Sequence, residues 1–348
     1  MADQPWAIGI AVFPQAAFGT PHAATVALAG TVDESEGAVL GAAGNGTGDS
    51  GITVPTFTIS ETPLADVTSS FTRQAGGIGT LLPEGLEIAF QWKGNGDTTT
   101  TPAADEAMPK AGVDAILQSA GLEGASGPAA PDWDYTPSAT PIYLTIKLWV
   151  AGNSFAFQDC ILESLSLPFV GGEGSIAVAR ISIGSVNTQS VVSPLPTFDY
   201  GAQATLTPPA SKSVAFTWGA LRGYGAFTAE IVNEIEQFED GNQPSGFRIG
   251  VSGRSVNGSG NLWMTADGTT EEYEYEALIA TVAPTDDMTW TLGTPAGATE
   301  VLNAIEMNLN NFRVTSVGYD RAGGNTQAVV DGYCTADAAG EELTIRFE

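Results

Sequence analysis

Three glutamates in one short segment come nearest to a catalytic arrangement in this sequence. Glu230, Glu234 and Glu236 are separated by even numbers of residues, so on a strand they share one face, with Ile231 and Ile235 on the other. Two such carboxylates are enough for a glycosidase. No group of aromatic residues that could hold a sugar accompanies them, and three like charges on one face are typical of a solvent-exposed strand. We therefore predict no catalytic residue among them.

Other residues that serve as nucleophiles, bases or metal ligands are scarce. His22 is the single histidine and follows a Gly-Thr-Pro turn, so a zinc site or a Ser–His triad would depend on one loop residue. Cys160 and Cys334 lie in separate strand-like segments without a motif that supplies a base, and two buried free thiols are favoured over a disulfide.

Glycine-rich loops offer no better site. The loop 44–51 contains Asn and Asp but lacks the spacing of an EF-hand, so a plain flexible loop is favoured over a calcium site. No dinucleotide-binding or P-loop motif is present. The sequence predicts neither an enzyme nor a cofactor or metal.

The charge balance is strongly acidic. The 348 residues include 40 Asp and Glu against 12 Lys and Arg, a formal net charge of −28. Nucleic-acid binding through phosphates needs clustered Lys and Arg, so this function is not expected. An acidic surface can repel polyanions or simply keep a protein soluble, and the charge fits both.

No sequence feature directs the chain to a membrane or out of the cell. No stretch approaches the roughly 20 apolar residues of a membrane span. Residues 1–6 lack the basic start of a signal peptide. We therefore expect a chain that is made and assembled in a cytoplasm.

Two segments show the spacing of an amphipathic helix. One extends from Pro109 to Gly121 and the other from Asp267 to Val282. Frequent glycine (42) and proline (20) favour short strands and turns elsewhere. The apolar stripes of the two helices are Val113, Ile116, Leu117 and Ala120, and then Tyr275, Leu278, Ile279 and Val282.

Alternating or apolar runs predict strands in both parts of the chain. The polar, Pro-rich segment 124–141 is predicted to be a connector between them. The predicted strands are 52–60, 86–92, 142–150, 155–169 and 175–185, followed by 213–218, 227–238, 247–253, 261–265, 288–292, 301–314, 326–335 and 343–347.

The order strands, one helix, strands occurs twice, which predicts a mainly β protein built from a duplicated domain. The boundary falls near residue 200, because the segment 192–209 holds four prolines and no regular pattern. We predict an extended N-terminal arm and loop over 1–50 that buries little, a first domain over 51–200 and a second over 201–348.

A competing alignment of the two halves exists. It matches 161–166 with 231–236 and 180–183 with 248–251, and it places the two helices on opposite sides of the matched strands. The helix-anchored alignment is preferred, because alternating strands match one another easily by chance.

One stretch resembles the tail tube proteins of long, non-contractile-tailed bacteriophages. In that family a Tyr-x-Pro-Ser turn leads into an alternating strand, a glycine turn and a second long strand, and a helix precedes them. The matching residues are Tyr135–Ser138, Leu144–Trp149, Gly152, Cys160, Leu165–Leu167 and the helix end at Ala120-Gly121, with a similar second half at 227–238 and Gly258–Leu262.

The resemblance implies two tandem tail-tube-type β-sandwich domains, each with one flanking α-helix. It implies a structural virion protein whose subunits join their inner sheets into rings that stack through loops and the N-terminal arm. A duplicated chain implies three copies per ring. The implied partners are other copies of the chain, a tape measure protein in the lumen, and tail terminator and distal tail proteins at the ends. DNA would pass through without sticking, and no membrane is involved.

In such a tube, carboxylates facing the lumen would keep DNA from adhering. We hypothesise that Glu230, Glu234 and Glu236 face that lumen. The alternatives are another β-rich virion protein, such as a capsid decoration or tail terminator protein, a secreted carbohydrate-binding or adhesive β-sandwich, and a two-carboxylate glycosidase.

Overall fold

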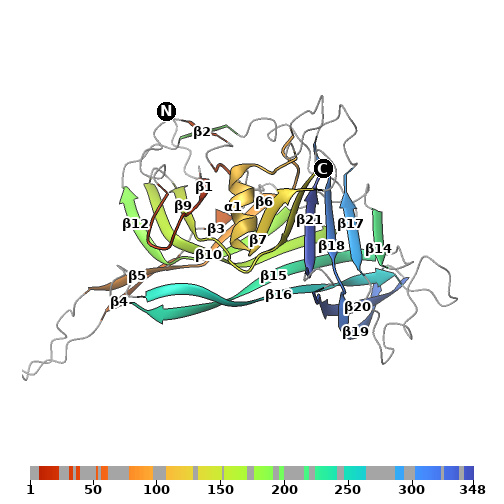
Figure 1. The fold of residues 1–348 in the computed structure, drawn as a ribbon. Helices are drawn as coiled ribbons and strands as arrows, with labels where there is room; N and C mark the ends of the chain where they lie inside the picture. The colour runs from red at the N-terminus through yellow and green to blue at the C-terminus, as the bar shows by residue number, and fades with distance from the viewer. Residues whose placement is uncertain are drawn as a thin grey trace, which may run out of the picture.

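The structure of the chain is a computed structural model, and it is mainly β (Figure 1). The residues that it describes are 8–22, 31–33, 37–39, 52–53, 56–61, 78–96, 107–127, 132–150, 153–170, 176–190, 196–199, 215–218, 224–240, 247–263, 287–293, 302–322, 325–336 and 341–348.

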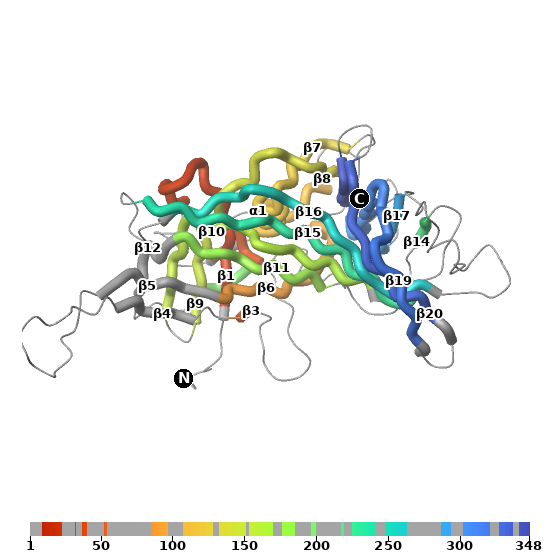
Figure 2. Tube along the Cα trace, turned by 90° about the horizontal axis from the view of Figure 1, so that it is seen from below, coloured from red at the N-terminus to blue at the C-terminus, as the bar shows by residue number. Residues whose placement is uncertain are grey.

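A sheet whose main path contains eight strands forms the base of the molecule, and Figure 2 views it from below. Neighbouring strands along this path are all antiparallel. We call this path the base sheet. Its order is β19 (Arg313–Ala322), β20 (Asn325–Tyr333), β16 (Phe247–Trp263), β15 (Tyr224–Glu239), β10 (Asn153–Val170), β11 (Ile176–Ser182), β6 (Leu86–Gln91) and β3 (Ile52–Thr53).

Further strands lie above the base sheet in two groups, one at the left and one at the right of Figure 1. At one end, the N-terminal part of β10 bends upward and pairs with β9 (Leu144–Val150) and β12 (Ser185–Ser190), and β9 pairs with β1 (Ile8–Pro14). At the other end is a sheet in the order β14 (Ala215–Trp218), β17 (Met288–Leu292), β18 (Ile305–Leu309), β21 (Leu343–Phe347), β8 (Trp133–Pro137) and β7 (Leu122–Ser126).

The remaining strands form two small pairs. β4 (Thr56–Glu61) and β5 (Ile78–Glu84) continue the β3–β6 hairpin, because Ile52 pairs with Ile88 and Thr56 with Glu84 in the same register. β13 (Thr197–Asp199) pairs in parallel with β2 (Thr31–Asp33).

The helix α1 (Ala111–Ser119) lies above the base sheet between the two upper groups of strands (Figure 1). Its apolar stripe is buried, with Ile116 and Leu117 fully inaccessible to solvent. Asp114 of α1 accepts a hydrogen bond of 2.6 Å from the hydroxyl of Tyr135 on β8. The helix predicted from Pro109 to Gly121 is therefore confirmed, whereas the one predicted over 267–282 lies outside the described residues.

Strand pairing repeats in the two halves of the chain. In the first half the order is β1-β9-β10-β12, and in the second it is β14-β17-β18-β21. The base sheet likewise contains β3-β6-β11-β10 followed by β15-β16-β20-β19. We call these two sets of strands unit 1 and unit 2, and we count α1, β7 and β8, which lie between β6 and β9 along the chain, with unit 1. β10 of unit 1 corresponds to β18 and β19 of unit 2 taken together.

Local backbone features repeat at equivalent positions and fix the alignment of the units. Among the described non-glycine residues, Asp159 (φ 53°) and Asn311 (φ 46°) have positive φ, and both lie at the bend between the two layers. A one-residue bulge follows each, at Leu162/Ser164 in β10 and at Val314/Ser316 in β19. By position along the sequence, α1 and the segment 264–286 both fall between equivalent strands in this correspondence.

Several predictions from the sequence were wrong in detail. Residues 8–14 do not lie in an arm that buries little: they form β1, in which Ile10 and Val12 are fully buried. Strands predicted at 247–253 and 261–265 are one continuous strand, β16. The single strand predicted at 301–314 is divided into β18 and β19 by the positive φ of Asn311.

The predicted connector 124–141 also contains structure. It includes β8 and most of β7, which pair with the sheet of unit 2 through β21. Tyr135 of β8 is fully buried. Both units also contribute to one hydrophobic core, in which Phe169 and Phe227 stack against Trp290 at ring-centroid distances of 5.3 and 4.8 Å.

Candidate assembly surfaces

The lower face of the base sheet, turned away from α1 and the upper strands, is polar. We call it the open face. One row across it consists of Ser316, Asp331, Ser259, Thr228 and Pro168 on five consecutive strands. The adjacent inward row, Val317, Val330, Gly260 and Phe227, belongs to the core side. The sheet therefore separates a buried apolar side from an open face that carries polar, acidic and basic residues, among them Arg180 opposite Ser164 and Arg313 opposite Tyr333.

The three glutamates singled out from the sequence lie on the open face of β15. Ile231 on the opposite face is buried (1% exposed), whereas Glu234 and Glu236 are exposed and Glu230 is half-buried. Glu234 and Glu236 lie beyond the part of β15 that pairs with β10, on the hairpin with β16 that projects past the sheet. The structure thus places all three on one face but spreads them along the strand, without gathering them into a pocket.

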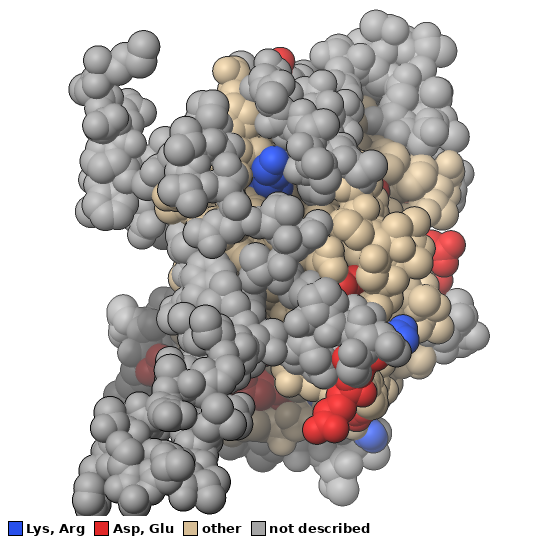
Figure 3. All heavy atoms as spheres, turned by 90° about the vertical axis from the view of Figure 1, so that its left-hand side faces the viewer, with Lys and Arg blue, Asp and Glu red and all other residues tan. Residues whose placement is uncertain are grey.

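Acidic side chains also outnumber basic ones on the end of the molecule shown in Figure 3, among the residues drawn in colour. Two basic residues among those described, Arg346 and Arg254, connect the two units of the chain.

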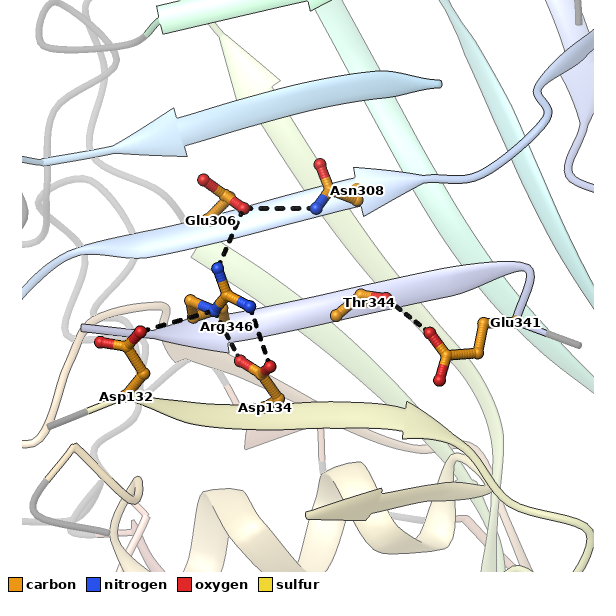
Figure 4. Close-up of polar contacts among 7 residues, drawn as sticks. All are labelled: Asp132, Asp134, Glu306, Asn308, Glu341, Thr344 and Arg346. Atoms are coloured by element: carbon orange, nitrogen blue, oxygen red, sulfur yellow. Dashed lines mark hydrogen bonds and ion pairs between the residues drawn. The ribbon is translucent and has the colours of Figure 1, made fainter. Parts of the chain in front are cut away.

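Arg346 on β21 of unit 2 is surrounded by carboxylates from both units (Figure 4). Its Nε and Nη2 donate hydrogen bonds of 2.7 and 2.9 Å to the two carboxylate oxygens of Asp134 on β8. Asp132 lies 3.9 Å from Nε, and Glu306 on β18 lies 3.7 Å from Nη1. With a side chain only 23% exposed, Arg346 holds β8 to the sheet of unit 2 by a bidentate ion pair.

Arg254 on β16 makes the second connection. It forms an ion pair of 2.5 Å with Glu342, and its Nε donates a hydrogen bond of 2.8 Å to the same carboxylate. Its Nη1 donates to the carbonyl oxygens of Gly121 and Ser138, at the C-terminal end of α1 and after β8. A cation at the carbonyl end of a helix is favourable, so this contact also fixes α1 against unit 2.

Glu348 next to this cluster has a pKa raised to about 7, first by burial and then by the negative charges of Glu306 and Asp132. An acid whose pKa rises on folding from an ordinary value of 4.5 stabilises the fold fully below pH 4.5, and that stability is lost as the pH rises through 7. We expect Glu348→Gln to remove this loss, so that the variant becomes the more stable chain above pH 7. Urea denaturation at several pH values between 4 and 8 measures it.

The control for this prediction is Glu341→Gln, which changes a partly exposed glutamate just before β21. Above pH 7 this variant should be less stable than Glu348→Gln, because it leaves the buried Glu348 carboxyl in place. If the free energy of unfolding of the natural chain and of Glu348→Gln changes in parallel between pH 4 and 8, the prediction is contradicted.

Both thiols are buried, and the histidine stacks on an aromatic ring. Cys160 and Cys334 are free and buried, as predicted. Burial raises the pKa of the Cys160 thiol well above its usual value, and the charge of Asp159 adds to this. The ring of His22 stacks on Phe13 at a centroid distance of 4.9 Å. A buried thiol with a raised pKa is a poor nucleophile.

Within the described ranges, no three His, Cys, Asp or Glu residues are grouped so that they could hold a metal ion. No helix in this part of the chain is long and apolar enough to span a membrane.

Comparisons with known proteins do not identify the chain. No protein-family model matches it, and no curated protein matches its sequence.

Reasoning from the sequence missed the two arginines that connect the units. Arg346 is separated from Asp134 by more than 200 positions, so no local spacing signals the contact. The one available signal was the alternation of Asp132, Asp134 and Thr136, which places two carboxylates on one face of a strand.

Proposed function

We propose that this chain is a structural protein of a phage tail, in which copies join edge to edge into rings that stack as a tube. The observation that supports the proposal is the repeated set of four strands in the base sheet. β3-β6-β11-β10 is followed by β15-β16-β20-β19, and strand directions alternate throughout. Because the repeat has an even number of strands, a further unit can follow in the same orientation by a rotation about one axis.

The open face gives this arrangement a use. If the sheet curves around an axis with its core side outward, the open face lines a central channel. Glu230, Glu234 and Glu236 are then lumen residues, and carboxylates there repel the phosphates of passing DNA. Three copies supply six units in a ring. A tape measure protein would occupy the channel during assembly, and terminator and distal tail proteins would close the ends of the tube.

Electron microscopy of the concentrated protein tests the proposal, with rings or hollow tubes of uniform width as the expected result. Monomers at every concentration, together with binding of a polysaccharide, would favour an adhesive β-sandwich instead. Rings that never stack would favour a tail terminator or a capsid decoration protein. Hydrolysis of a glycan that is lost on substitution of Glu230 would favour a glycosidase.

The lumen assignment predicts a difference in chemical access. Glu234→Cys should react with a maleimide carried on a large polymer when the protein is monomeric, and much more slowly in assembled tubes, because the polymer cannot enter the channel. The buried Cys160 and Cys334 give little background. Labelling is read as a shift in gel mobility.

The matched control is Glu123→Cys, at an exposed position on β7 in the upper layer. It should react equally in monomers and tubes. If Glu234→Cys is labelled as fast in tubes as in monomers, the glutamates lie on the outside and the assignment is wrong.

A further inference from the structure

At one edge of the base sheet lies β19, and its equivalent β10 has a neighbouring strand on both sides. Among the described strands, β19 pairs only with β20, whereas its counterpart β10 pairs with β11 on one side and with β15 on the other. Leu167 in that internal joint is 1% exposed, and its counterpart Tyr319 on β19 is 60% exposed. β19 thus leaves exposed a position whose equivalent on β10 is covered in the internal joint.

The other end of the base sheet has the matching strand. β3 pairs with β6 alone in the described part of the sheet, and it is equivalent to the part of β15 that β10 contacts. In unit 1, successive cross-strand pairs lead from Leu165 on β10 through Ala179 and Ile88 to Ile52 on β3. In unit 2, the pairs that start at the equivalent Val317 on β19 lead through Val330 and Gly260 to Phe227 on β15. Ile52 and Phe227 are therefore equivalent positions.

We infer that β19 of one copy pairs with β3 of a second copy, antiparallel and in the register of the internal β10–β15 joint. Strand directions permit it, since β19 runs parallel to β10 and β3 runs parallel to β15 through the alternating sheet. An edge strand can accept a further strand, and pairing it inside a ring removes the risk of aggregation. The inference specifies the partner and the joint for the ring assembly, and in that respect rests on the proposed function.

The internal joint fixes the residue pairs. Pro168 lies opposite Thr228, and Phe169 opposite Phe227. Transferred to the equivalent positions, this pairing places Asp320 opposite Thr53, and Arg321 opposite Ile52. Opposed residues of an antiparallel pair have Cα atoms about 4.5–5.5 Å apart, which a disulfide can bridge.

Cysteine cross-linking of the full-length chain tests the register. Asp320 and Thr53 are both exposed, so Asp320→Cys and Thr53→Cys are compatible with folding. They lie at opposite ends of the base sheet, so a disulfide between them must join two copies. The double variant, oxidised after assembly, should yield covalent oligomers that end at one closed size on a non-reducing gel. Mixing the two single variants should yield mostly dimers.

The matched control pairs Thr53→Cys with Ser316→Cys. Ser316 is exposed on the same face of β19 but four residues from Asp320, about 13 Å along the strand. It should cross-link far less than Asp320→Cys. Titration with a small thiol reagent before oxidation establishes that the new cysteines are reactive in every variant.

The outcomes separate this inference from the proposed function. Cross-linking of neither pair in a protein that forms tubes overturns the β19–β3 joint and leaves the tube proposal in place. Cross-linking of the Ser316 pair in preference overturns the register. Closed covalent oligomers without tubes in the microscope support the joint and count against the tail tube.

Discussion

Tyr319→Lys should leave the monomer folded and prevent assembly. The side chain is 60% exposed in the monomer, so the free energy of unfolding is expected to change by less than about 0.5 kcal/mol. In a joint equivalent to β10–β15, its position corresponds to that of the buried Leu167. An ammonium group buried there is expected to cost about 3 kcal/mol, which raises the concentration needed for assembly by about a hundredfold. Light scattering against protein concentration measures the threshold.

The matched control is Tyr333→Lys on the neighbouring strand β20. Tyr333 is 36% exposed and lies on the open face, outside the proposed joint. This variant carries the same change of charge and should assemble at nearly the natural threshold. If both variants assemble like the natural chain, β19 is not an assembly edge.

Arg346→Met should destabilise the chain strongly. The substitution keeps most of the apolar stem but leaves Asp132, Asp134 and Glu306 close together without their cation. Removing one partner of a fully buried ion pair costs about 3–5 kcal/mol. This cluster is part-buried, so we expect a loss of about 2–3 kcal/mol, because the remaining charges stay largely desolvated and repel one another. The pKa of Asp132 is already raised, mainly by burial, which shows how poorly solvated this cluster is. Urea denaturation near pH 7 gives the free energy of unfolding.

Two further variants make this prediction specific. Arg180→Met removes an ion pair with Glu87 of similar length, 3.1 Å, but the arginine is 63% exposed, so the loss should stay below about 1 kcal/mol. Adding Asp134→Asn to Arg346→Met should restore part of the lost stability, since it removes one of the repelling charges. Equal effects of Arg346→Met and Arg180→Met would show that the cluster does not hold the units together.

Much of the fold follows from residue patterns that are local. The stripe Val113, Ile116 and Leu117 specifies α1, and strict alternation specifies β6, β17 and β21, whose burial alternates as expected. The glutamates of β15 were likewise placed on the face opposite Ile231.

The strands that were missed or misjudged depend on contacts that a local pattern does not contain. Glycines interrupt the residue pattern of β16, although the strand itself is continuous. At Gly258 the reason is steric, because the rings of Phe227 and Phe312 lie 2.7 Å from the position that a Cβ atom would occupy. β1 alternates Gly9 and Ala11 with Ile8, Ile10 and Val12 within a Gly- and Ala-rich region, and its pairing with β9 places it in the sheet. The pairing of β10 with β15, on which the assembly hypothesis depends, joins segments about 60 residues apart and has no local signal.

The two arginines that connect the units have no counterparts at the equivalent positions of unit 1. Arg346 pairs with Glu306, where unit 1 has Ser190 opposite Ser154, and Arg254 lies opposite Asn233, where unit 1 has Leu82 opposite Thr58. A cylinder made of such chains would have seams of two kinds in alternation, one reinforced by charge and one held by backbone and packing alone. Under tension or torsion the cylinder should separate between molecules first. This separation would release intact monomers that can assemble again.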